Sequence, residues 1–209
     1  MPGTLIDVAW IAFQAIGIVL LVDIIAGAAH WAEDTFWSED SVIVGRLFIR
    51  ASVVHHSQTG ANAFLDKHWA ESSRGLLVSA PTLLLLAWFL GILTWQVWLF
   101  IIVGACSQQV HRFSHTPTYR TPAFVRWLQR YHVIQRPAEH WNHHRGDGNT
   151  HYCVVTPYTN PLLDRIGLWR GLERVLVPVF GAPRREDLRD KAWYRSAGLL
   201  QGHRLRRTA

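Results

Sequence analysis

The chain has 209 residues, an ordinary size for one domain, and its two cysteines are too few for a disulfide framework. Nearly half of the residues are hydrophobic and only 17% are charged, whereas a typical soluble domain has roughly 25% charged residues, so the composition argues against a soluble protein. The formal net charge of +6 is compatible with nucleic acid, anionic lipid or an acidic protein as partner, and its distribution along the chain must decide.

The first predicted element is an apolar helix over residues 4–29, in which Asp7, Gln14 and Asp23 are the strongly polar side chains. It is long enough to cross a hydrocarbon core of about 30 Å. No Lys or Arg precedes it, so the basic region of a signal peptide is missing, and we predict a retained transmembrane helix. A buried helix of a soluble protein is the alternative. Asp23 is costly inside a membrane, which makes it a candidate functional acid or a polar contact to a neighbouring helix.

A second apolar block covers residues 76–106, which is too long for one comfortable span and short for two. Gly91 and residues 94–96 predict a tight turn between two helices. Helices of about 17 residues would each reach about 26 Å, which fits a thin bilayer or a partly re-entrant hairpin. We favour two spans here and three in the whole chain.

The distribution of positive charge supports three spans. All 21 Lys and Arg residues lie in 46–75 or 112–209. With three spans both segments are on the inside and the turn at 92–96 is outside, as the positive-inside rule requires. A single long second span would place the two basic segments on opposite faces.

Two amphipathic helices are predicted at the membrane interface, over residues 122–134 and 160–176. Pro122 would begin the first, and Asn160 would cap the second, with Pro161 in its first turn. The predicted fold class is therefore an all-α integral membrane protein, with about three transmembrane helices and further cytosolic or interfacial helices.

Histidines gather in four groups near the cytosolic ends of the predicted spans. His30 and Asp34 are spaced i and i+4 on one helix face, and His111 and His115 share that spacing. A pair of adjacent histidines and an H-x-x-H-H cluster complete a set of eight histidines and one carboxylate. The set is His30, Asp34, His55, His56, His111, His115, His140, His143 and His144.

The combined set indicates a metal centre, although each group alone is weak evidence. Neutral imidazole is costly to bury without a partner and is the commonest metal ligand. A catalytic zinc needs three protein ligands, so this number of donors suits two metal ions, and nitrogen donors with open positions favour iron. The H-E-x-x-H zinc motif is absent, because Glu139 precedes His140. A haem between two histidines is a further alternative, although it would prefer a facing pair within the membrane.

Other polar residues are weaker candidates. His132, His151 and Glu139 could contact metal or support a ligand through a hydrogen bond. Asp34 could itself bind metal or hold the far nitrogen of a ligand imidazole. The sequence assigns no catalytic group beyond the metal centre.

Six segments from about His30 to Glu173 form an ordered set of motifs: HWAEDTFW, FIRASVVHH, QQVHRFSH, HWNHH, YCVVTPYTN and IGLWRGLE. Together they resemble the Kua lipid-desaturase family, which includes plasmanylethanolamine desaturase, a bacterial counterpart linked to carotenoid synthesis, and a plastid desaturase of palmitate on phosphatidylglycerol. The resemblance implies an integral membrane enzyme with a histidine-rich di-iron centre. It implies O2 as co-substrate and an external electron donor of the cytochrome b5 or ferredoxin type. It also implies that the nine residues of the set are the iron ligands.

The chain departs from the animal ether-lipid enzymes at Glu139 and Gly148, where those enzymes have histidines. The segments SQQVH and NTHYCVV are closer to the plastid type, whereas YHVI and IGLWRGLE are closer to the ether-lipid type. We predict a desaturase that forms the vinyl-ether bond of a plasmanyl lipid, with an acyl-chain desaturase of a phospholipid such as phosphatidylglycerol as the alternative. A di-iron lipid hydroxylase, a zinc-dependent membrane hydrolase and a non-catalytic haem or metal-binding membrane protein are the remaining alternatives.

The desaturase domain is expected to cover residues 1–182, followed by a basic tail over 183–209. We expect a multi-pass protein of a bacterial inner membrane, with the metal site on the cytosolic side. Its expected partners are a membrane lipid and an electron-transfer protein, and we expect no nucleic acid. The basic cytosolic face could attract an acidic electron carrier or anionic lipid.

Overall fold

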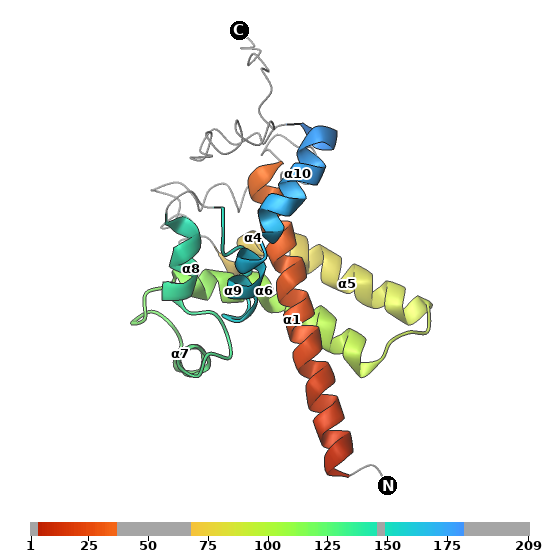
Figure 1. Cartoon of the computed structure of the whole chain (residues 1–209). Helices are drawn as coiled ribbons and strands as arrows, with labels where there is room; N and C mark the ends of the chain where they lie inside the picture. The colour runs from red at the N-terminus through yellow and green to blue at the C-terminus, as the bar shows by residue number, and fades with distance from the viewer. Residues whose placement is uncertain (1–3, 37–67, 146–148, 182–209) are drawn as a thin grey trace.

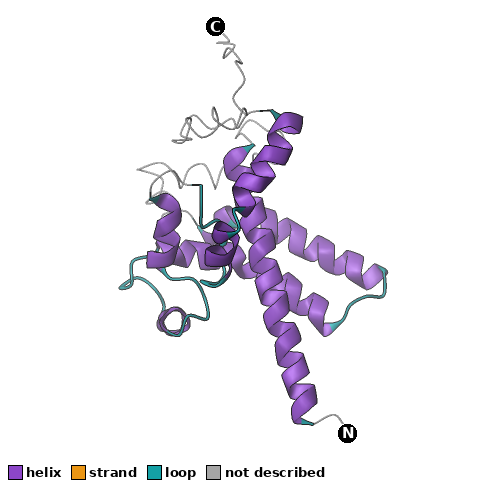
Figure 2. Ribbon diagram, in the orientation of Figure 1, coloured by secondary structure: helices purple, strands orange, loops and turns teal. Residues whose placement is uncertain are grey.

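The computed structural model describes residues 4–36, 68–145 and 149–181, and all regular structure in these ranges is helical (Figures 1 and 2). The helices are α1 (Leu5–Thr35), α4 (Trp69–Ser72), α5 (Arg74–Phe89), α6 (Trp95–His115), α7 (Ala123–Arg130), α8 (Pro137–His144), α9 (Thr159–Arg165) and α10 (Leu168–Phe180). The predicted all-α fold is thus confirmed for this part of the chain. The predicted tail over 183–209 and the pair His55 and His56 lie outside the described residues.

Helix α1 begins at a capping box, in which the backbone N–H of Asp7 donates to the side chain of Thr4 and the Asp7 carboxylate accepts from the Thr4 N–H. It continues past the predicted end at residue 29, because nothing in HWAEDT breaks a helix, and so carries His30 and Asp34 on its last turns. Among the described helices, α1 is the one long and apolar enough to cross a membrane.

Helices α5 and α6 form the predicted helical hairpin. The turn contains Gly91 at a φ of +67°, and the Thr94 side chain caps α6 by accepting the N–H of Val97. Helix α5 has 16 residues and is about 24 Å long, shorter than a hydrocarbon core of about 30 Å. Figure 1 shows the hairpin lying obliquely across α1, and α6 packs against both α1 and α5. That both hairpin helices cross the membrane remains a prediction.

Of the two predicted interfacial helices, the structure contains the first in shortened form and divides the second into two. Helix α7 follows Pro122 as predicted but ends at Arg130, ahead of His132, whose φ is +57°. The prediction of one helix over 160–176 is wrong, because the chain breaks into α9 and α10 at Gly167, which has a φ of +66°. The N–H of Gly167 donates to the carbonyl oxygen of Asp164, which ends α9.

Asn160 also differs from its predicted role as a helix cap. It lies inside α9, whose N-cap is Tyr158. Its side-chain oxygen accepts the backbone N–H of Cys153 at 2.8 Å, and its amide nitrogen donates to the Cys153 carbonyl at 2.8 Å. Asn160 therefore holds segment 149–158, the irregular stretch between α8 and α9.

The core joins this segment to α1 and to α10. Its buried members are Trp31, Tyr152, Cys153, Leu163 and Trp169. A second attachment is made by Asp23 on α1. Its carboxylate accepts the N–H of Val155 at 2.7 Å and the N–H and hydroxyl of Thr156 at 3.0 and 2.7 Å, and it also accepts the hydroxyl of Thr159. The predicted intramembrane acid is thus fully buried and anchors segment 149–158.

Candidate metal centre

Three buried side chains from α1 and α8 bring their donor atoms together. Nε2 of His143 lies 3.3 Å from Oδ2 of Asp34, and Nε2 of His30 lies 3.5 Å from the same oxygen. The i, i+4 spacing on α1 predicted that His30 and Asp34 share a face. The three donor atoms lie within 4.8 Å of one another, close enough to bind one ion. We call this set group A.

A second set, group B, consists of His111 and His115 on α6 and His140 on α8. Nε2 of His111 lies 3.0 Å from Nε2 of His140 and 3.3 Å from Nε2 of His115. Nε2 of His144 lies 3.0 Å from Nε2 of His140, so His144 extends this group. Seven of the nine predicted ligands therefore converge, and the other two lie outside the described residues.

The two groups form one cluster because α8 contributes to both. The offsets of 0, 3 and 4 in H-x-x-H-H place His140 and His144 toward group B and His143 toward group A. The ring centroids of His30 and His111, one from each group, are 5.1 Å apart, and those of His140 and His143 are 5.8 Å apart. A two-metal arrangement matches this pairing of neighbouring groups.

Backbone carbonyls of segment 149–158 set the orientation of two imidazoles. Nδ1 of His143 lies 2.7 Å from the Thr150 carbonyl oxygen, and Nδ1 of His30 lies 3.0 Å from the Tyr152 carbonyl oxygen. A carbonyl only accepts, so in the neutral form of each imidazole Nδ1 carries the proton and Nε2 keeps its lone pair. Both lone pairs then face the Asp34 carboxylate, an arrangement that is repulsive by itself and that a cation would stabilise.

The protonation state of His140 in group B also suits metal binding. Burial, followed by the nearby His111 and the other imidazoles, holds the pKa of His140 well below its usual value of 6.5. At neutral pH this imidazole is therefore uncharged, as a metal ligand must be. Donors that are mainly imidazole nitrogen with one carboxylate fit iron, and the same atoms could bind zinc.

The three weaker candidates lie outside both groups. Nδ1 of His132 is 3.5 Å from Oε1 of Glu139, and the Glu139 carboxylate also accepts from the N–H and guanidinium of Arg136 at the start of α8. Nδ1 of His151 is 3.0 Å from Oδ2 of Asp164. His132 and His151 both have positive φ, at +57° and +61°. His132 and His151 therefore lie outside the helices, whereas Glu139 lies in the first turn of α8.

Sequence reasoning missed the groups that position the candidate ligands. The carbonyls of Thr150 and Tyr152 carry no residue signature, because every residue has a carbonyl. A second missed residue is Gln135, fully buried, whose side-chain N–H donates to the Cys153 carbonyl at 2.8 Å. The signal that could have found Gln135 is its polar side chain two positions before α8, the helix that carries H-x-x-H-H. Glu33, next to Asp34, was also not singled out.

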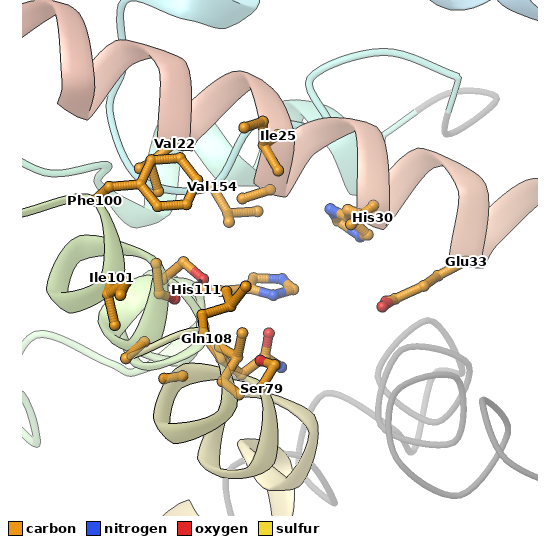
Figure 3. Close-up of a pocket in the computed structure, with 18 residues that line it drawn as sticks. Val22, Ile25, His30, Glu33, Ser79, Phe100, Ile101, Gln108, His111 and Val154 are labelled. Carbon is orange, nitrogen blue, oxygen red and sulfur yellow. Dashed lines mark hydrogen bonds between the residues drawn. The ribbon is translucent and has the colours of Figure 1, made fainter. Parts of the chain in front are cut away.

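An apolar cavity of about 220 Å³ lies between α1, α5 and α6, beside the cluster (Figure 3). His30 of group A and His111 of group B both line it, and Glu33 and Gln108 lie near them. Its remaining lining is mainly apolar. The residues are Val22, Ile25, Ala26, Ala29, Leu76, Ser79, Ala80, Leu83, Phe100, Ile101, Gly104, Ala105, Ser107 and Val154.

Comparison with known proteins supplies a family match. The model of the lipid desaturase domain matches residues 19–187. A probable fatty acid desaturase of Acanthamoeba polyphaga mimivirus is 35% identical over 157 residues, which cover 74% of this chain and 76% of the viral protein. Mouse (Mus musculus) plasmanylethanolamine desaturase 1 is 32% identical over 81% of this chain and 66% of its own length. Plasmanylethanolamine desaturase of Myxococcus xanthus is 28% identical over 89% of this chain and 68% of its own length. No solved structure matches the chain.

Proposed function

The chain belongs to the lipid desaturase family, and on that premise we propose that it is an O2-dependent di-iron desaturase that forms the vinyl-ether bond of a plasmanyl lipid. The observation that carries the proposal is the convergence of seven sequence-predicted ligands at one end of an apolar cavity. An apolar cavity that reaches a cluster of metal ligands suits a hydrocarbon substrate and oxidative chemistry.

Group A and group B would each hold one iron ion. Two irons reduced by an external donor would supply the activation of O2 and the removal of two hydrogens from adjacent carbons. The balanced reaction takes one CH2–CH2 unit, O2, two electrons and two protons to one CH=CH unit and two waters. The electrons require a donor protein of the cytochrome b5 or ferredoxin type.

The protein's own residues would position the ligands and exclude water. The carbonyls of Thr150 and Tyr152 keep Nε2 of His143 and His30 directed at the Asp34 carboxylate. Asp23 and Asn160 hold the segment that carries those carbonyls. Val22 and Ile101, which line the cavity, would exclude water from the hydrocarbon chain of the substrate.

The substrate assignment rests on the named relatives. The mouse and Myxococcus relatives carry the name plasmanylethanolamine desaturase, which favours a vinyl-ether product. The viral relative is named a probable fatty acid desaturase, which keeps an ester-linked acyl chain as the second candidate. Both candidates use the same cluster and cavity.

The proposed setting is a bacterial inner membrane crossed by α1, α5 and α6, with the cluster at the cytosolic boundary. The apolar length of α1 supports the first crossing. The location of all Lys and Arg residues after residue 45 and outside the hairpin turn supports the orientation. An acidic electron carrier would dock on the basic cytosolic side.

The test is mass spectrometry of membrane lipids from a host that expresses the chain and is fed an alkyl-ether lipid, beside a His143→Ala control. Loss of two hydrogens together with an acid-labile ether chain is the expected result. Loss of two hydrogens from an acid-stable acyl chain would assign the second candidate, and gain of an oxygen atom would assign a hydroxylase. An unchanged lipid profile with no bound iron would contradict the di-iron proposal.

A further inference from the structure

The lining of the cavity changes from polar to apolar along its length. On α6 its lining runs from Phe100 and Ile101 through Gly104 to Gln108 and His111, at helical spacings that keep one face toward the cavity. On α1 the lining runs from apolar Val22 to the polar end at His30 and Glu33. Figure 3 shows Val22 and Phe100 together on the side of the cavity opposite His30. The cavity is thus polar at the metal-binding cluster and apolar away from it.

The apolar part extends well beyond the histidines. Ten residues separate Ile101 from His111, which corresponds to about 15 Å along α6. Eight residues separate Val22 from His30, or about 12 Å along α1. A single alkyl chain, entering past the histidines, has the shape and polarity that this space requires.

Gly104 occupies a special position in this lining. A β-carbon built at Gly104 meets no heavy atom within 4 Å, although Gly104 lies on the cavity-lining face of α6. The space beside it is therefore open because glycine has no side chain. A methyl group at position 104 would therefore extend into that space without displacing another part of the protein, and a longer side chain would start from an unobstructed β-carbon.

Building on the proposed function, we propose that this cavity binds the part of the lipid chain on the methyl side of the reacting carbons, and that Gly104 determines the chain length it accepts. The reacting carbons lie beside His30 and His111, and the rest of the chain runs between α1 and α6 toward Phe100. Chains long enough to reach Gly104 gain apolar contact there, and a side chain at that position would exclude them.

The test compares Gly104→Leu with wild type on a stearyl and an octyl ether lipid, measured as conversion of each by mass spectrometry. The octyl chain is too short to reach Gly104 from the histidines, so we expect the ratio of stearyl to octyl conversion to fall about tenfold, because displacing two methylene groups from apolar surroundings has roughly that effect. Gly17→Leu is the matched control, since Gly17 also has open space around its β-carbon position but lies on the exposed part of α1, away from the cavity. An unchanged ratio in Gly104→Leu would overturn the proposal. If the leucine variant fails to fold, Gly104→Ala makes the same comparison with a single added methyl.

A binding measurement separates this inference from the proposed function. Purified protein in nanodiscs is irradiated with an ether lipid that carries a diazirine at the methyl end of its chain, and the labelled peptides are mapped. We expect labelling around Phe100 in wild type and a several-fold loss of it in Gly104→Leu. Labelling of the exposed apolar face of α1 should be equal in both proteins and serves as the internal reference. Labelling at Phe100 by a protein that converts no lipid would support the cavity as the binding site of the chain and contradict the proposed desaturation. Equal labelling at Phe100 in both proteins would contradict the cavity assignment.

Discussion

Gly27 on α1 lies directly against Cys153, and a β-carbon at position 27 would come within 2.6 Å of the Cys153 Sγ and 3.1 Å of its backbone. We therefore expect Gly27→Ala to push segment 149–158 away from α1 and to destabilise the protein by about 1–3 kcal/mol, as overpacking does. Thermal unfolding in detergent checks this. Gly17→Ala adds the same methyl to the same helix in open space and should leave the unfolding temperature unchanged or slightly raised. Equal effects of the two variants would contradict the close contact.

Replacing Asp23, the buried residue that anchors segment 149–158, should destabilise the protein more than Gly27→Ala does. In Asp23→Asn, one side-chain oxygen becomes an NH2 donor that faces the N–H and hydroxyl donors of Thr156 or Val155. We expect a loss of about 2–3 kcal/mol and a reduced iron content. Asp7→Asn is the matched control on the exposed first turn of α1, and it should cost about 1 kcal/mol or less. Full stability with loss of activity alone would instead assign Asp23 a functional role.

Removal of a group A imidazole should weaken iron binding at group A. His143 is fully buried and faces Asp34, so we expect His143→Ala to lose the group A iron, about half of the total, and to lower lipid conversion at least a hundredfold. His132→Ala removes a half-exposed imidazole that pairs with Glu139 and should retain iron and most activity. Metal analysis of the purified variants checks both. Normal iron content in His143→Ala would exclude it as a ligand.

The metal-free protein should become less stable in acid. Because burial and the neighbouring imidazoles lower the pKa of His140 in the folded state, the unfolded chain binds this proton first as pH falls below 6.5. Stability is therefore intact above that pH and is lost below it, by about 1.4 kcal/mol per pH unit for one such group. Unfolding temperatures of chelator-treated protein should fall less steeply for His140→Gln than for wild type. Parallel curves would show that His140 does not carry the effect.

Cys153 should resist alkylation while the protein is folded. Burial, helped by the nearby Asp23 charge, raises the pKa of the Cys153 thiol to about 12. At pH 8 the reactive thiolate is then roughly one part in ten thousand, and the side chain is also inaccessible. We expect a Cys106→Ser variant to take up no iodoacetamide until denaturant is added, and then to take up one equivalent by mass spectrometry. Rapid labelling before unfolding would mean that segment 149–158 opens readily.

Local spacing was enough to predict the helices that carry the candidate ligands. His30 with Asp34, and His111 with His115, follow from the helical repeat alone, and the structure places both pairs on single helices. The turn at Gly91 was also visible, because apolar length limits a span. These features depend on neighbours within a few residues, which is why the sequence predicts them.

Long-range attachments could not be predicted in this way. The break at Gly167 depends on a positive φ that a glycine permits but does not require. Asn160 looked like a helix cap, whereas it binds Cys153, and Asp23 binds residues 132 to 136 positions later. The distribution of imidazoles between groups A and B likewise depends on how α8 packs, which no local pattern contains.

The attachment of segment 149–158 to Asp23 has a consequence for biosynthesis. At 5–20 residues per second, roughly ten seconds separate the synthesis of Asp23 from that of the Val155 and Thr156 donors that neutralise its cost of burial. During that interval the nascent helix holds an acid without these donors. A ribosome that stops before residue 155 would release a chain in which Asp23 never receives them, so the burial of this acid depends on synthesis continuing through segment 149–158.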